Sequence, residues 1–320
     1  MVAKIAVAGE ALIDLVVGTS GEVDARPGGG PYNAARTMAR LGAATTFLGR
    51  LADDGFGRLL RDRLTEEDVV LGVPEWSAKP STLAVAAVDQ VGAAAYSFYL
   101  NGTAAADLGY ETLRKSLPAD VTAVHVGTLG LVMEPVGAAI ERLVLADVSA
   151  DALVLLDPNC RPGAVADHDG YRRRIAAITQ RADIVKASVE DLAYLYPGVS
   201  AEEAALAVLD AGPSLVLVTD GPRPARAFLP GSVLAEEVPS VTVVDTIGAG
   251  DAFGGGFLAW WTAHGLGKAD LGLPAPARDA LVGKALHAAT AVAALTCARP
   301  GADPPTLSEL QSRDWWPEAQ

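Results

Sequence analysis

The sequence has 320 residues, of which half are hydrophobic and only 6% aromatic, so Ala, Val and Leu must build most of the core. Its 25 basic and 39 acidic residues give a formal net charge of −14. An acidic chain attracts neither nucleic acid nor an anionic membrane without a local basic stripe, and its densest basic run covers only residues 172–174. The composition therefore argues against a nucleic-acid partner.

The N-terminal residues lead directly into a strand-like segment and lack the apolar region of a signal peptide. The longest apolar stretch, 285–298, is too short for a membrane span and predicts a buried helix. The two cysteines, Cys160 and Cys297, give no disulfide framework, and the four histidines lack zinc-ligand spacing. We therefore expect a cytoplasmic protein without a membrane partner.

Short apolar runs alternate with helical patterns along most of the chain. The runs are mostly continuous and rich in Val, Ile or Leu, which is typical of strands covered on both faces. We predict strands at residues 5–8, 45–48, 121–126, 153–156, 184–185, 215–218 and 241–244. We predict helices near 31–41, 56–67, 134–147, 169–180, 189–196, 201–211, 250–264 and 276–297. This alternation predicts an α/β fold with a doubly wound, mostly parallel sheet.

One region breaks the alternation. Residues 81–89 and 94–100 are predicted as two strands joined by a Gly-containing turn, and 11–17 as a short strand directly after the first. Together they predict a small antiparallel sheet that either covers a ligand site as a lid or is an ordinary edge hairpin. No linker divides the chain, so we expect a single domain over 1–320 with a lid formed by about 10–30 and 80–103.

The segment 245–257, with the sequence DTIGAGDAFGGGF, combines a glycine-rich turn with the start of a helix. Gly248 and Gly250 let backbone N–H groups converge at a helix N-terminus, where an anion is stabilised. A phosphoryl group that gains charge during transfer would be held there, while Asp251 accepts a proton from an alcohol. The alternative is a tight turn followed by a first-turn carboxylate without a catalytic function.

The sequence argues against two other kinds of nucleotide-binding loop. No Gly-x-x-x-x-Gly-Lys-Ser/Thr segment exists, so the chain has no P-loop. The first strand leads into residues 9–14 (GEALID) rather than Gly-x-Gly-x-x-Gly, which makes a Rossmann dinucleotide site, and with it a dehydrogenase, a distant alternative.

Five segments in the same order resemble the ribokinase/PfkB family of carbohydrate kinases, especially its fructokinase-like members. They are residues 9–14, 27–36 (PGGGPYNAAR), 156–161 (LDPNCR), 245–253 and 294–305. The resemblance implies a ribokinase-like fold and an ATP-dependent sugar kinase. It implies catalytic roles for Gly248, Ala249, Gly250, Asp251 and Arg161.

The resemblance also implies ligand-binding residues. For the sugar these are Asp14, Gly28, Gly29, Asn33, Phe98, Asn159, Arg161 and Asp251. For ATP they are Lys186, Ser188, Thr219, Gly221, Gly248, Gly250 and His287. Asp191 or Glu190 would organise Mg²⁺, and Asp245 with the Ile247 carbonyl would bind a monovalent cation such as K⁺.

The sequence departs from the family in ways that leave the acceptor open. Ser188 replaces the usual Asn of an Asn-x-x-Glu stretch, and Leu100 stands where fructokinase-like members often have an Arg. We expect the acceptor to be fructose or a related monosaccharide. The alternatives are a 2-keto-3-deoxygluconate kinase, a ribokinase or a nucleoside kinase, or a catalytically silent sugar sensor. We also expect a homodimer paired through the lid.

Overall fold

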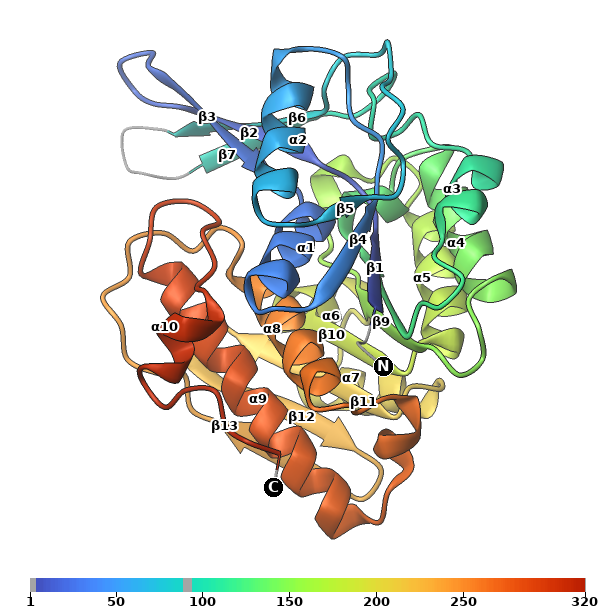
Figure 1. Ribbon diagram of the computed structural model, residues 1–320, viewed down its shortest axis with the longest axis vertical. Helices are drawn as coiled ribbons and strands as arrows, with labels where there is room; N and C mark the ends of the chain where they lie inside the picture. Colours follow the sequence, from blue (N-terminus) through green and yellow to red (C-terminus); the bar gives the residue numbers. More distant parts are fainter. Residues whose placement is uncertain (1–3, 89–93, 320) are drawn as a thin grey trace.

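The computed structural model describes residues 4–88 and 94–319, which form a three-layer domain and a smaller sheet that projects from it (Figure 1). The main sheet contains β1 (Lys4–Ala8), β4 (Ala44–Leu48), β5 (Val70–Leu71), β8 (Ala123–Gly127), β9 (Leu153–Asp157), β10 (Ile184–Ser188), β11 (Leu215–Asp220), β12 (Arg223–Leu229) and β13 (Ser232–Glu236). Their order is β13-β12-β11-β10-β9-β8-β1-β4-β5. β12 and β13 pair antiparallel and the others parallel, which confirms the predicted mostly parallel sheet.

Helices cover both faces of this sheet because alternate side chains of each buried strand enter different cores. Ile5 and Val7 of β1 belong to one hydrophobic cluster, and Ala6 and Ala8 to the other. The first cluster is covered by α1 (Gly30–Arg40), α2 (Gly55–Glu66), α8 (Ala249–Ala263), α9 (Ala275–Cys297) and α10 (Leu307–Gln311). The second is covered by α3 (Tyr110–Ser116), α4 (Val136–Ala146), α5 (His168–Arg181), α6 (Val189–Leu195) and α7 (Ala201–Asp210).

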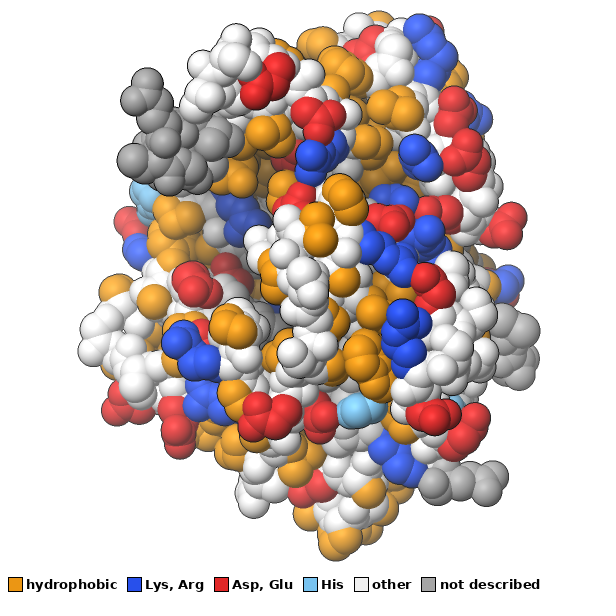
Figure 2. All heavy atoms as spheres, turned by 90° about the vertical axis from the view of Figure 1, so that its left-hand side faces the viewer, with side chains coloured by type: hydrophobic (Ala, Val, Ile, Leu, Met, Phe, Trp, Pro, Cys, Tyr) orange, Lys and Arg blue, Asp and Glu red, His pale blue; other side chains and the backbone are white. Residues whose placement is uncertain are grey.

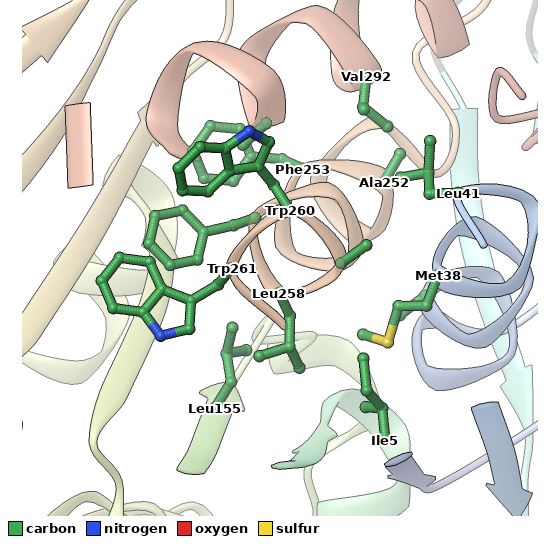
Figure 3. Close-up of a cluster of buried hydrophobic side chains, with 14 of the residues drawn as sticks. Ile5, Met38, Leu41, Leu155, Ala252, Phe253, Leu258, Trp260, Trp261 and Val292 are labelled. Atoms are coloured by element: carbon green, nitrogen blue, oxygen red, sulfur yellow. The ribbon is translucent and has the colours of Figure 1, made fainter. Parts of the chain in front are cut away.

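Helix α8 lies at the centre of the first cluster. Trp260 and Trp261 are fully buried, and the Trp261 ring stacks on Phe257 with centroids 5.8 Å apart. Figure 3 shows Leu258 directed toward Leu155 of β9. Helix α9, the one described helix with the length and apolar composition of a membrane span, packs against α8 and is mostly buried, as the core helix of a soluble domain is. The core therefore holds α8 firmly against the sheet.

The predicted strand at 241–244 was wrong. Residues 237–248 are irregular, and the side chains of Val243 and Val244 are exposed. The Val244 N–H donates to the Cys297 carbonyl at 2.8 Å, so this segment is held by the end of α9 instead of by a sheet neighbour. An apolar run of four residues indicated a strand, but no neighbouring strand is available to cover it.

The smaller sheet has the order β3-β2-β6-β7, with β2 (Leu12–Val17), β3 (Val23–Gly28), β6 (Leu83–Val88) and β7 (Ala94–Tyr99). The pairs β2–β3 and β6–β7 are antiparallel, but the central pair β2–β6 is parallel. The sheet is therefore mixed, and the prediction of a purely antiparallel sheet was wrong. β3 was not predicted as a strand. The predicted turn between β6 and β7 lies outside the described residues. We call these four strands the lid sheet.

Candidate active site

A cavity of about 530 Å³ lies between the lid sheet and the N-terminus of α8. Figure 2 shows a hollow on this face, below the lid sheet. Its lining combines segments far apart in the sequence: Glu10, Leu12, Asp14, Gly29, Gly30, Asn33, Ala84, Tyr96, Phe98, Thr128, Leu129, Asn159, Arg161, Pro162, Gly163, Thr246, Ile247, Gly248, Gly250 and Asp251. All the predicted sugar-binding residues except Gly28 line it.

The turn before α8 has the geometry of an anion site. Gly248, the N-cap residue, has φ 77°, in the left-handed region that favours glycine. A Cβ on Gly248 would lie 2.5 Å from the Ala302 Cβ, so the turn also needs the missing side chain for its close approach to residues after α9. The first N–H groups of a helix have no intrahelical acceptor, and those of Gly250 and Asp251 lie at this cavity.

The carboxylate of Asp251 is buried but belongs to the cavity wall. Its Oδ2 accepts a hydrogen bond from Asn33 Nδ2 at 2.9 Å, and its Oδ1 accepts one from Asn159 Nδ2 at 3.2 Å. Asn33 comes from α1, whereas Asn159 follows β9 with a φ of 38°. Two amides thus orient the carboxylate without protonating it, as a general base requires.

A second carboxylate, that of Asp14 on β2, lies across the cavity. Burial and the nearby charge of Asp251 together raise the pKa of Asp14 to about 6, although Arg161 and Arg26 act to lower it. Gly28 pairs with Leu12, two residues before Asp14 on β2, and a Cβ on Gly28 would clash with the Asp14 carboxylate. Asp14 can therefore accept hydrogen bonds from two hydroxyl groups of a ligand.

Arg161 extends a positive charge into the cavity from the loop after β9. Its Nη1 donates to the carbonyl groups of Asn159 at 3.3 Å and Cys160 at 3.1 Å. The guanidinium has no carboxylate partner within salt-bridge distance among the described residues. Its other donors are thus free for a ligand oxygen.

Glu10 is a cavity residue that the sequence analysis missed. Its Oε1 accepts hydrogen bonds from the Gly30 N–H at 3.0 Å and from the Thr128 hydroxyl, and its Oε2 accepts one from the Gly130 N–H at 2.6 Å. Burial raises the pKa of Glu10 to about 7, although these donors lower it. Glu10 thus ties the start of α1 to the segment after β8. Its position beside Gly9 in the GEALID segment was the available signal.

Three of the predicted ATP residues lie together at the carboxyl edge of the sheet. Ser188 and Thr219 are neighbours in the β10–β11 register, and Gly221, with φ 57°, makes the turn into β12. His287 lies elsewhere, because its Nδ1 is 2.8 Å from Oε1 of Glu236 in a groove of about 500 Å³ between α9 and β13. Lys186 is buried beneath α8 and does not reach the cavity surface.

The carboxylate of Asp191 does not fit a direct Mg²⁺ ligand. Its Oδ1 accepts a hydrogen bond from the Cys160 N–H at 2.6 Å, and its Oδ2 accepts one from the Ser188 N–H at 2.8 Å. Both oxygens are therefore already engaged by backbone N–H groups. Glu190 is exposed. Among the described residues no group of three or more His, Cys, Asp or Glu side chains could hold a metal ion. Mg²⁺ here would be carried mainly by nucleotide phosphates and water.

Asp245, the predicted monovalent-cation ligand, is also occupied by N–H donors. Its Oδ1 accepts the Ile247 N–H at 3.0 Å, and its Oδ2 accepts the Gly301 N–H and Arg26 Nη1, each at 2.9 Å. The guanidinium of Arg26, from the lid strand β3, therefore lies where a cation would bind Asp245. These residues do not fit a bare cation in this arrangement.

Comparison with known proteins gives the family. The family model for pfkB carbohydrate kinases matches residues 2–309. A fructokinase from Rhizobium leguminosarum bv. trifolii is 36% identical over 257 residues, which cover 78% of this chain and 77% of that protein.

Solved structures agree in fold. A fructokinase with bound ATP from Xylella fastidiosa has a TM-score of 0.88 and 28% identity, over 98% of this chain and 100% of that one. A fructokinase from Vibrio cholerae O395 in a fructose-, ADP- and calcium-bound form has a TM-score of 0.83 and 25% identity, over 97% and 98% of the two chains. The chain therefore belongs to the pfkB family of carbohydrate kinases. It is an ATP-dependent sugar kinase.

The raised pKa of Glu10 predicts a pH-dependent stability. The folded protein binds a proton at Glu10 more tightly than the unfolded chain, so this stabilisation is complete below about pH 4.5 and is lost as the pH rises through about 7. In Glu10→Gln the contribution is absent. The free energy of unfolding of the wild type should therefore fall relative to that of the variant between pH 5 and 8, by up to about 3 kcal/mol.

Urea unfolding at several pH values measures this difference. Glu237→Gln, at an exposed position, is the matched control and should follow the wild type. Parallel pH profiles for the wild type and Glu10→Gln would show that Glu10 stays ionised throughout this range.

Proposed function

We propose that this kinase transfers the γ-phosphoryl group of ATP to a primary hydroxyl of fructose or a closely related monosaccharide. The observation that carries the proposal is the Asp251 carboxylate, oriented by two amides beside an open helix N-terminus in a cavity of about 530 Å³. The fructokinases similar to this chain, one of them solved with fructose and ADP, support the choice of acceptor.

The acceptor is held from two sides in this proposal. Asp14 accepts hydrogen bonds from sugar hydroxyls, and the backbone at Gly29 approaches the ring closely because it carries no side chain. Asn33 contributes its amide, and Phe98 of β7 covers the sugar from the lid. Because the lid sheet supplies both Asp14 and Phe98, we propose that residues 10–30 and 80–103 act as the lid of a single domain.

Asp251 removes the proton from the bound hydroxyl as that oxygen attacks the phosphoryl group in line. The N–H groups of the turn Gly248–Ala249–Gly250 and the guanidinium of Arg161 stabilise the charge that develops on the transferred group. Ser188, Thr219 and Gly221 hold the nucleotide at the adjacent sheet edge. Mg²⁺ bound to the ATP phosphates supplies further charge neutralisation. Positioning and electrostatics provide most of the acceleration.

A panel of acceptors assayed with ATP and Mg²⁺ tests the substrate assignment. Fructose should give the highest kcat/KM among fructose, ribose, 2-keto-3-deoxygluconate and nucleosides. A higher value for a nucleoside would move the assignment to that class, which is the alternative that the missing arginine at Leu100 keeps open. Ligand-induced thermal stabilisation without turnover of any acceptor would favour a sugar sensor.

The variant Asp251→Asn tests the base. The amide keeps the size of the side chain but cannot accept the hydroxyl proton, so kcat should fall by at least about 100-fold. The dissociation constant for ATP, measured by calorimetry, should change by less than about twofold. Asp120→Asn is the matched control, since Asp120 is exposed and pairs with Lys4 far from the cavity. Turnover near the wild-type level in Asp251→Asn would refute the base assignment.

We further propose that two chains pair through their lid sheets, in the cytoplasm, where ATP is abundant and both cysteines stay reduced. Val23 on β3 and Tyr99 on β7 are exposed large hydrophobic side chains on the two outer strands of the lid sheet, and a second lid would cover them. Light scattering of the purified protein should give the mass of a dimer. A monomer mass at micromolar concentration would contradict this pairing.

A further inference from the structure

A cluster of three polar side chains is buried beneath the first turns of α8, outside the cavity. His125 of β8, Asp157 of β9 and Lys186 of β10 come from three neighbouring strands, and each residue is at most 2% exposed. Lys186 Nζ lies 2.9 Å from Asp157 Oδ2. Buried charges are rare unless they are paired, and such pairs are weak evidence for stability alone. This cluster therefore needs an explanation.

Helix α8 has glycine at the two positions that cover the cluster. A Cβ on Gly250 would lie 2.9 Å from Lys186 Nζ, and a Cβ on Gly254, one turn later on the same helix face, 3.8 Å from His125 Nε2. Around the Gly250 position, the described atoms within 4 Å are Lys186 Nζ and Cε. The ammonium group of Lys186, and not the carboxylate of Asp157, thus faces the helix backbone.

The cluster is costly for the fold. Both ring nitrogens of His125 and Oδ1 of Asp157 find no hydrogen-bond partner among residues 4–88 and 94–319. Each such buried group costs about 1–3 kcal/mol. Burial lowers the pKa of His125 to about 3, so the imidazole is neutral, and raises that of Asp157 to about 7. Burial also acts to lower the pKa of Lys186, but Asp157, Asp191 and Asp251 outweigh it and raise that pKa.

We propose that Lys186, held by Asp157, is a positioning residue that fixes a positive charge beneath the turn Gly248–Gly250. From there the ammonium adds to the potential of the helix N-terminus and stabilises charge that develops on the transferred phosphoryl group without touching ATP. A Cβ on Gly250 would press on the Lys186 ammonium group, whereas a Cβ on Gly254 would make only an ordinary van der Waals contact with His125.

The proposal rests on phosphoryl transfer at this turn and makes a kinetic distinction. Lys186→Met should lower kcat by at least about 30-fold and change the KM for ATP by less than about threefold, because the side chain does not contact the nucleotide. A direct phosphate ligand would instead raise the KM for ATP strongly. Lys268→Met is the matched control: Lys268 pairs with Asp183 at 3.0 Å next to the other end of β10 and should leave kcat unchanged.

Lys186→Met leaves Asp157 buried without its partner and so risks misfolding. The double variant Lys186→Met/Asp157→Asn removes both charges and should restore the thermal midpoint to within a few degrees of the wild type. If the pair serves only the fold, kcat recovers with stability in the double variant, which would overturn the proposal. If Lys186 acts as proposed, the double variant folds and binds ATP, and kcat stays low. Absence of turnover in the wild type would instead refute the function of the site.

Discussion

The structure depends on the contact between the N-terminus of α8 and the carboxyl edge of the large sheet. The left-handed conformation of Gly248 turns the chain into the helix at a point where α8 is anchored by buried side chains such as Phe257 and Trp261. Because the helix cannot shift within a close-packed core, the amide groups at its start keep fixed positions. The cavity is therefore shaped before any ligand binds, which is what electrostatic stabilisation of a transition state requires.

Two layers of polar side chains meet this helix end. Above it, the carboxylate of Asp251 is oriented by amides from α1 and from the loop after β9. Below it, a lysine–aspartate pair lies in the apolar interior. The same small space thus contains the proposed proton acceptor and the lysine proposed to set the local potential, and Gly250 lets the lysine approach the helix backbone.

Much of this could be predicted from local sequence. The buried parallel strands were visible as apolar runs, and Asp251 was indicated by the glycine-rich turn before it. Asn33 and Asn159 were implied by the resemblance to the family. Glu10 was missed because its three partners are 20, 118 and 120 residues away, and only its place in the GEALID segment pointed to it. The parallel pairing of β2 with β6 and the burial of Lys186 likewise depend on tertiary neighbours. The apolar run 241–244 misled the prediction because its valines face solvent.

The ion pair between Arg26 and Asp245 joins the lid sheet to the turn before α8. Arg26 belongs to a strand of the lid sheet, and Asp245 begins the segment that leads to α8. In the proposed reaction, a sugar that shifted the lid would act on this segment through the ion pair. Because linkage is reciprocal, any tightening of nucleotide binding by sugar would be matched by an equal tightening of sugar binding by nucleotide. A single arginine would then make the two substrates heterotropic effectors of each other.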